Sequence, residues 1–399
     1  MYELPSGRLL HTREVLDDEA VHGLEAVVVA QPNDSPSPLP KPPPPPPPPP
    51  LLLLLHGVRQ VRVYRLDSSG RPTEILACGC ACRVLALREL LHLNALAVGC
   101  DDNVLRLWHL PKPEAAAAVA TAAASRAGRA PLPVQRISCT ARSILYAMAL
   151  QRVADPAAPM LAAVGSAFRT VLVWDARPVA HGDTLSQQPP HEHCRRPPLW
   201  QLEGHEGAVF RLAWSGTLLA SVSDDRRAML WRVVPPSPGS EAGAADAGGQ
   251  PPLLRSEHSW FAHSVRIWDC CWASDGGEEG LQLATAGEDG SAKLWRIACG
   301  RSTKGGGGER IELLSTLRGH AGKHVWCVAA SSGGAGSPRL LASGGADGAV
   351  KLWPLSSAAS DGGDRDEHRL CKASLELSSI EVSGGEGLPR DAPIRAVQV

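Results

Sequence analysis

The chain of 399 residues is poor in long apolar runs, in net charge and in aromatic residues other than tryptophan. No stretch approaches the ~20 apolar residues of a membrane span, and the N-terminal sequence MYELPSGRLLHTREVLDDEA lacks the basic start and apolar run of a signal peptide. The net charge is −1, so binding of nucleic acid would need a local basic patch. These absences predict a cytoplasmic protein without membrane contact.

The sequence also lacks a disulfide framework and a recognisable catalytic motif. Its 11 cysteines are an odd number without regular spacing, which favours a reducing compartment. No Ser/His/Asp or Cys/His arrangement stands out, and the glycine-rich GGAGSPRLLASGGADG has no following helix to form a nucleotide cradle. We therefore expect neither an enzyme nor a cofactor, and no small-molecule substrate.

Two segments invite a metal-binding interpretation. Cys78, Cys80 and Cys82 alternate with Gly79 and Ala81, whereas zinc ligands usually come as C-x₂₋₄-C with a second pair elsewhere. The run His191-Glu192-His193-Cys194 lies in a stretch of low complexity. We expect no metal site in either segment.

Tryptophan is the exception among the aromatic residues, with 11 copies against 3 Tyr and 3 Phe. Several tryptophans end the same repeated pattern, in which an apolar segment, a tight polar turn and an alternating segment follow one another. The copies are LAVGCDDNVLRLWHL (Trp108), LAAVGSAFRTVLVWDA (Trp174), LLASVSDDRRAMLWRV (Trp231), LQLATAGEDGSAKLWRI (Trp295) and LLASGGADGAVKLWPL (Trp353). An earlier and more divergent copy of the repeat has Tyr64 in the tryptophan position.

Aspartate and histidine recur with these tryptophans at consistent offsets. Aspartates lie six residues before four of them, at Asp102, Asp225, Asp289 and Asp347, and histidines lie upstream of three, at His205, His263 and His320. This pattern resembles the WD40 repeat, in which a buried His, Ser or Thr, Asp and Trp form a hydrogen-bonded brace in each four-stranded blade.

The resemblance implies that only the Trp231 copy has a complete brace. Its members would be His205, Ser223, Asp225 and Trp231. The Trp295 and Trp353 copies have Gly in the position of Ser223, and the Trp174 copy has Phe168 in place of the aspartate. Those blades are expected to depend more on packing.

The resemblance predicts an all-β fold, a WD40 β-propeller with six traceable four-stranded blades and one strand of an incomplete seventh. The blades would cover residues 20–77, 80–139, 142–204, 207–262, 265–319 and 324–377, with IRAVQV at the end as the orphan strand. Residues 1–19 would be an N-terminal tail and residues 20–399 the propeller. Low-complexity inserts are expected at 31–50, 111–131, 177–198, 235–252, 300–309 and 356–368.

The inserts indicate which face of the propeller binds partners. With blade strands lettered a to d from the channel outward, every long insert follows strand a or strand c, so all of them reach one face. A nine-proline run in the first insert could dock on an SH3- or WW-type domain, although a tolerated low-complexity insert is the simpler interpretation. We predict that the opposite, short-loop face binds partners or tRNA, through Arg142, Arg169, Arg226, Arg227, Arg266, Lys323 and His324.

Particular blades resemble one WD-repeat family more than the general consensus. The segments CTARSILYAMAL, HSVRIWDCCW and RGHAGKHVWCVAA resemble the N-terminal propeller of the large WD-repeat subunit of the tRNA wobble-nucleotide 2′-O-ribose methyltransferase. In that family a separate FtsJ-type subunit, with S-adenosylmethionine, performs the chemistry. The resemblance implies a non-catalytic scaffold that positions tRNA and that methyltransferase subunit. The alternative is a generic adaptor, such as a ubiquitin-ligase substrate receptor or a signalling scaffold.

Overall fold

The computed structural model describes sixteen parts of the chain. They are residues 2–3, 8–9, 16, 21–28, 51–67, 70–111, 132–152, 160–181, 184–185, 194–232, 254–274, 280–298, 310–322, 324–331, 339–355 and 373–376. Within these parts the regular structure is β-strand, apart from one short 3-10 turn at Leu91–Leu93. None of the helical structure in these ranges is long and apolar enough to cross a bilayer.

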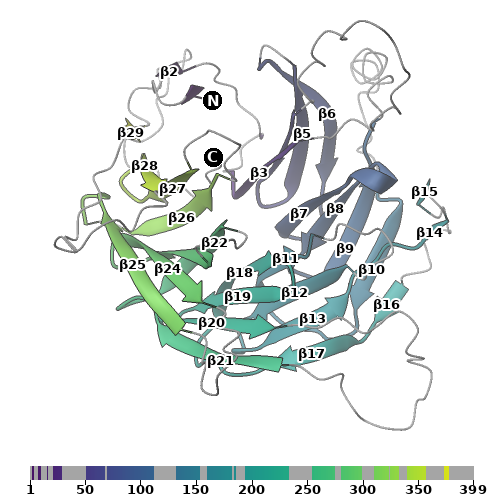
Figure 1. The fold of residues 1–399 in the computed structure, drawn as a ribbon. Helices are drawn as coiled ribbons and strands as arrows, with labels where there is room; N and C mark the ends of the chain where they lie inside the picture. The colour runs from purple at the N-terminus through teal and green to yellow at the C-terminus, as the bar shows by residue number, and fades with distance from the viewer. Residues whose placement is uncertain are drawn as a thin grey trace, which may run out of the picture.

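Six sheets form a ring, each built on four antiparallel strands, and the sheet of blade 2 has a fifth strand (Figure 1). This confirms the predicted six-bladed propeller with WD40 repeats, while IRAVQV at residues 394–399 lies outside the described residues. Blade 1 contains β3 (Gly23–Val28), β4 (Leu51–His56), β5 (Gln60–Leu66) and β6 (Pro72–Gly79). Blade 2 contains β7 (Val84–Leu90), β8 (Ala95–Cys100), β9 (Val104–His109) and β10 (Gln135–Cys139). Blade 3 contains β11 (Leu145–Leu150), β12 (Leu161–Ser166), β13 (Val171–Asp175) and β17 (Pro198–Leu202).

The remaining three blades follow the same order without interruption. Blade 4 contains β18 (Val209–Ser215), β19 (Leu218–Ser223), β20 (Arg227–Arg232) and β21 (Leu254–Phe261). Blade 5 contains β22 (Ile267–Ser274), β23 (Leu281–Gly287), β24 (Ser291–Ala298) and β25 (Arg310–Arg318). Blade 6 contains β26 (Val325–Ala330), β27 (Arg339–Gly345), β28 (Ala349–Leu355) and β29 (Ala373–Glu376). A separate pair, β1 (Tyr2–Glu3) and β2 (Arg8–Leu9), lies in the predicted N-terminal tail.

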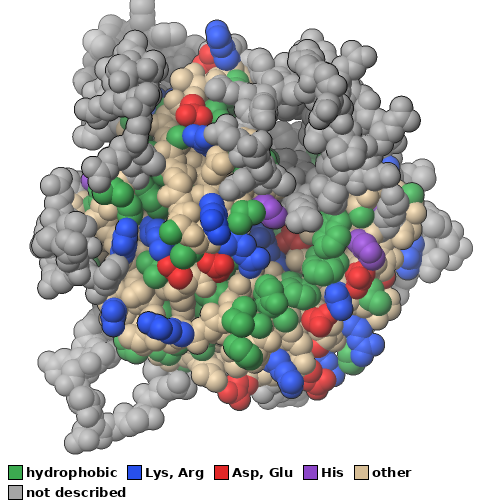
Figure 2. All heavy atoms as spheres, turned by 180° about the vertical axis from the view of Figure 1, so that it is seen from behind, with side chains coloured by type: hydrophobic (Ala, Val, Ile, Leu, Met, Phe, Trp, Pro, Cys, Tyr) green, Lys and Arg blue, Asp and Glu red, His purple; other side chains and the backbone are tan. Residues whose placement is uncertain are grey.

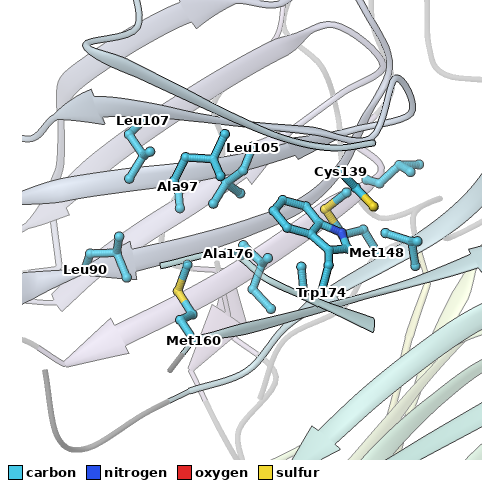
Figure 3. Packing of buried hydrophobic residues seen from close by; sticks show 14 of the residues in the cluster. Leu90, Ala97, Leu105, Leu107, Cys139, Met148, Met160, Trp174 and Ala176 are labelled. Atoms are coloured by element: carbon cyan, nitrogen blue, oxygen red, sulfur yellow. The ribbon is translucent and has the colours of Figure 1, made fainter. Parts of the chain in front are cut away.

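The second strand of blades 2, 3 and 4 is buried along its whole length because both of its faces are covered. Every residue of β8, β12 and β19 is buried, as expected for a strand packed on both sides. The core therefore lies between neighbouring blades. Figure 3 shows one such layer, in which Trp174 and Met148 of blade 3 pack with Leu105 and Leu107 of blade 2.

Part of the predicted insert at 177–198 is folded onto blade 2. Its residues form β14 (Ala180–His181), β15 (Thr184–Leu185) and β16 (Cys194–Arg196). Strand β16 pairs in parallel with β10, which gives blade 2 a fifth strand. Leu185 is buried in the layer between blades 2 and 3. Although this segment was expected as a low-complexity insert, it covers the otherwise open outer edge of β10.

Polar side chains join the innermost strands around the channel. The carboxylate of Asp269 in β22 lies 2.8 Å from the Arg211 guanidinium of β18 and accepts a hydrogen bond from the backbone N–H of Val328 in β26. Arg88 of β7 donates to both Glu25 in β3 and the carbonyl of Leu150 in β11. Each of these groups spans three consecutive blades, so the inner strands that border the candidate site are held in fixed positions.

Candidate partner-binding face

In blade 4 the brace is complete, but its hydroxyl comes from Ser221 rather than from Ser223. Trp231 Nε1 donates to Ser221 Oγ at 2.8 Å, and this hydroxyl also lies 2.8 Å from His205 Nε2. The other imidazole nitrogen, Nδ1, lies 2.8 Å from Asp225 Oδ2. Because the serine accepts the indole hydrogen and donates its own, His205 Nδ1 carries the proton that Asp225 accepts.

The assignment of Ser223 was therefore wrong, and it had a physical cause. Ser221 and Ser223 are two apart in β19, so they lie on the same face of the strand. Ser223 lies nearer the turn, where its hydroxyl accepts from the backbone N–H of Asp225. The hydroxyl that reaches the indole lies ten residues before Trp231, across the β19–β20 pair.

Blades 5 and 6 have the same brace, contrary to the expectation that glycine breaks it. His263 contacts Thr285, which accepts from Trp295 at 3.1 Å, and Nδ1 of His263 lies 3.0 Å from Asp289. The corresponding set in blade 6 is His320, Ser343, Asp347 and Trp353. A hydroxyl ten residues before each of three tryptophans was the signal in the sequence that could have revealed all three braces.

Burial and hydrogen bonding shift the acid–base equilibria of the braces. Burial alone would raise the pKa of Asp225, but the hydrogen bond and charge of His205 and two backbone N–H groups hold that pKa below its ordinary value. Desolvation lowers the pKa of His263, against the opposing effect of Asp289. In blade 5, burial thus favours the neutral form of His263, and, against the effect of burial, the interaction with His263 holds the pKa of Asp289 below its ordinary value.

Blades 2 and 3 lack the brace. In blade 2, Asp102 receives hydrogen bonds from Arg106 at 2.6 and 3.0 Å and from the Cys82 thiol at 3.3 Å. In blade 3, Phe168 stands in the aspartate position with 63% of its surface exposed, and the buried indole nitrogen of Trp174 has no hydrogen-bond partner in the described part of the chain. Blade 3 therefore lacks, among the described residues, the hydrogen bond to its tryptophan that blades 4 to 6 have.

The short-loop face has a regular backbone frame. In blades 2 to 6, the residue before the inner strand accepts a hydrogen bond from the first residue of the b–c turn, at 2.8–3.0 Å. The pairs are Asp101 with Arg83, Ala167 with Ile144, Asp224 with Ala208, Glu288 with Arg266, and Ala346 with His324. These bonds tie each loop that leads into strand a to the b–c turn of the same blade, and they make the face rigid.

Four aromatic side chains form an arc across this frame, from Tyr146 in blade 3 through Phe210 and Trp268 to Trp326 in blade 6. Successive ring centroids are 5.6, 5.0 and 4.7 Å apart. Each ring belongs to the residue skipped by a register shift near the start of its inner strand, and β-bulges of this kind redirect side chains. Figure 2 shows hydrophobic side chains gathered near the middle of one face of the ring, with charged side chains around them.

The structure divides the predicted basic residues into different environments. Arg142 and Arg169 are exposed, whereas Arg266 lies 2.7 Å from Asp224 and 3.8 Å from Glu288. Arg226 and Arg227 lie over the Phe261 ring, with their guanidinium carbons 5.3 and 4.3 Å from its centroid. His324 donates to the carbonyl of Glu288 and packs against Trp326. Lys323 lies outside the described residues.

Two of these arginines, Arg169 and Arg226, have a left-handed backbone conformation that is unfavourable for residues other than glycine. Five equivalent b–c turns place one residue in the left-handed region, and the residues are Asn103, Arg169, Arg226, Gly290 and Gly348. The φ angles of Arg169 and Arg226 are +69° and +70°. For a non-glycine residue this conformation costs about 1 kcal/mol or more, so blades 3 and 4 keep an exposed arginine at a cost in stability.

The described residues contain no group of three or more His, Cys, Asp or Glu side chains suited to a metal ion. Burial raises the pKa of the Cys78 thiol to about 12, so this side chain is a poor source of thiolate. His191 and His193 lie outside the described residues, and Cys194 lies in β16.

Comparison with known proteins identifies WD40 repeats in the chain. The family described as WD domain, G-beta repeat, matches residues 196–232, 254–296 and 311–354. Each match runs from the outer strand of one blade to the third strand of the next. The three matches end one residue after the three tryptophans that have a complete brace.

Several curated relatives share weaker similarity. The human tRNA (34-2'-O)-methyltransferase regulator WDR6 is 26% identical over 224 residues, which cover 56% of this chain and 16% of that protein. The bovine protein of the same name is 27% identical over 224 residues, with the same coverage. The Drosophila melanogaster protein SEC13 homolog is 28% identical over 223 residues, or 52% of this chain and 55% of that protein. The chain thus spans about a sixth of the length of the tRNA methyltransferase regulators it matches.

Proposed function

We propose that this chain is a non-catalytic WD-repeat scaffold for 2′-O-ribose methylation at the tRNA wobble position. In this proposal it binds an FtsJ-type methyltransferase subunit in the cytoplasm and contacts tRNA through the resulting complex. The observation that carries the proposal is the similarity to tRNA (34-2'-O)-methyltransferase regulators from human, orangutan, cattle, mouse and rat, at 25–27% identity.

The geometry of the short-loop face supports a scaffolding role. The rigid frame holds the aromatic arc in place, and exposed arginines accompany it. Aromatic and arginine side chains dominate the energetics of many protein interfaces. A scaffold that holds the wobble ribose against the methyl donor accelerates the reaction through orientation, without contributing a reacting group.

Loss of the gene tests this function directly. We expect ribose-methylation mapping of tRNA from a knockout to show reduced 2′-O-methylation at the wobble position in a subset of tRNAs. Re-expression of the wild-type gene should restore the modification. Undiminished wobble methylation in the knockout would contradict the proposal.

A generic adaptor is the second candidate, because a relative with an unrelated name matches almost as well. The SEC13 homolog has similar identity, and the match covers more than half of its length. Affinity purification of the chromosomally tagged protein separates the two functions. Recovery of the FtsJ-type subunit together with tRNA supports the methylation scaffold. Stable recovery of other protein assemblies without that subunit supports the adaptor.

A further inference from the structure

Exposed apolar side chains concentrate at one point of the short-loop face. Of seven large hydrophobic residues that are exposed in the described structure, three lie together in the loops and bulge of blade 3. They are Ile144, Tyr146 and Phe168, with exposed fractions of 59, 42 and 63%. We call these three residues and Arg169 the blade-3 tip.

The blade-3 tip is fixed by short hydrogen bonds rather than presented on a long loop. The N–H of Ala167 donates to the carbonyl of Ile144 at 2.9 Å, which ties the two short loops together. The hydroxyl of Ser166 accepts from the N–H groups of Phe168 and Thr170 and lies 2.9 Å from the Thr170 hydroxyl. A rigid apolar surface of this kind loses little conformational entropy when it binds.

The same residues reduce the stability of the blade that carries them. Phe168 replaces the aspartate that contacts the brace histidine in blades 4 to 6, so blade 3 lacks that hydrogen bond. Arg169 adopts the left-handed conformation where blades 5 and 6 have glycine. Large exposed apolar residues give little folding benefit, so exposed Phe168 and Ile144 beside the strained Arg169 indicate selection for another purpose.

The charges of Arg169 on the tip and of Arg142, two residues before Ile144, are also uncompensated within the described structure. No ion pair reaches Arg142 or Arg169 there, while Arg266 on blade 5 is offset by Asp224 and Glu288. The tip is therefore complementary to an apolar pocket with carboxylates at its rim.

We propose that the blade-3 tip is the anchor by which this propeller binds a partner protein, inserting Phe168 and Ile144 into an apolar pocket bordered by acidic residues. Resting on the proposed function, the inference identifies that partner as the FtsJ-type methyltransferase subunit. A protein fits the tip better than RNA does. The branched side chain of Ile144 offers no ring for a base to stack on, whereas an apolar pocket can enclose it.

Two single substitutions test the anchor with opposite expected effects on stability. Phe168→Ala removes an exposed ring and should leave the melting temperature nearly unchanged. Arg169→Gly relieves the left-handed backbone and should raise the melting temperature by a few degrees. Both should weaken binding of the purified FtsJ-type subunit by at least about 10-fold, measured by calorimetry. Weaker binding by a more stable variant cannot be attributed to unfolding.

Matched controls come from exposed leucines elsewhere on the propeller. Leu132→Ala, before β10, and Leu313→Ala, on β25, remove side chains that are 69 and 45% exposed, and both should bind like wild type. If both tip variants also bind like wild type, the anchor is wrong although the scaffold function stands. Loss of tRNA binding with retained binding of the protein subunit would also overturn it, in favour of an RNA contact.

The proposed function can fail independently of the anchor. If the wild-type chain does not bind the FtsJ-type subunit, the methylation function fails. The binding test of the tip variants is then repeated with the protein that copurifies with wild type, instead of the FtsJ-type subunit. Loss of that protein from both tip variants, but not from the leucine controls, supports the anchor. Its retention by the tip variants overturns the anchor.

Discussion

Blades 3 and 4 are neighbours with the same strand order, but they have different side chains at the positions of the brace. Blade 4 has an aspartate, a histidine and a serine around a hydrogen-bonded tryptophan, whereas blade 3 has Phe168 and Val164 around a tryptophan whose indole nitrogen has no partner in the described structure. The register of β12 with β13 matches that of β19 with β20. The fold therefore does not require the brace, since inter-blade packing suffices, and an unbraced turn is free to present other side chains.

The largest expected effect comes from removing the hydroxyl at the centre of a brace. Ser221→Ala leaves both His205 Nε2 and Trp231 Nε1 without their partner, so we expect a loss of roughly 2–4 kcal/mol in the free energy of unfolding. Ser223→Ala, two residues along the same strand, removes only a hydroxyl that accepts from a turn N–H and should cost about 1 kcal/mol or less. Urea unfolding of the two variants measures the difference. Equal losses would mean that the brace is wrongly assigned.

A buried histidine outside the braces should make the protein sensitive to acid. Burial lowers the pKa of His56 in blade 1 to about 4, with a smaller contribution from the charge of Arg211, against the bond to the Gly57 carbonyl. An unfolded histidine titrates near 6.5. Between these values the unfolded chain binds more protons, so stability falls as pH falls, by up to about 3 kcal/mol at pH 4.

His56→Gln removes this titration and provides the control. The variant should lose less stability than wild type between pH 6.5 and pH 4.5, as measured by urea unfolding at each pH. His263 also has a pKa lowered by burial, against the opposing effect of Asp289, so it remains a source of acid sensitivity in the variant. Parallel pH profiles for wild type and variant would show that another group causes the acid sensitivity.

Adding the missing hydroxyl to blade 3 should leave the free energy of unfolding nearly unchanged. Val164 lies ten residues before Trp174, in the position that Ser221 occupies in blade 4. Val164→Thr buries a hydroxyl but gives the Trp174 indole an acceptor, so we expect a change within about 1 kcal/mol. Val173→Thr, at a fully buried valine on the next strand, should cost more, about 1–3 kcal/mol. Equal costs in thermal unfolding would show that the threonine does not reach the indole.

The smallest effect should come from shortening the proline run. Deleting residues 42–49 removes part of a predicted loop insert, and loop closure depends only weakly on length, so stability should change by less than about 0.5 kcal/mol. Leu185→Ala, in the insert that folds onto blade 2, should cost about 2–3 kcal/mol. Loss of partner binding after the proline deletion, with stability unchanged, would favour a docking peptide for an SH3- or WW-type domain.

The sequence by itself determined the repeat and the strands. Tryptophan, aspartate and histidine at fixed offsets predicted the blades, because their spacing along the chain is set by strand and turn lengths that are local properties. The predicted blade ranges match the sheets: the range 80–139 contains β7 to β10, and the range 265–319 contains β22 to β25.

Only the tertiary structure decided which of two serines completes the brace, because both lie on one face of β19 and the distance to the indole depends on pairing with β20. It also decided that β16 joins blade 2 rather than remaining in a loop, since pairing of β16 with β10 brings together residues far apart in sequence. The aromatic arc likewise required the structure. Its four residues come from four blades, and bulges rather than strand alternation set the direction of their side chains.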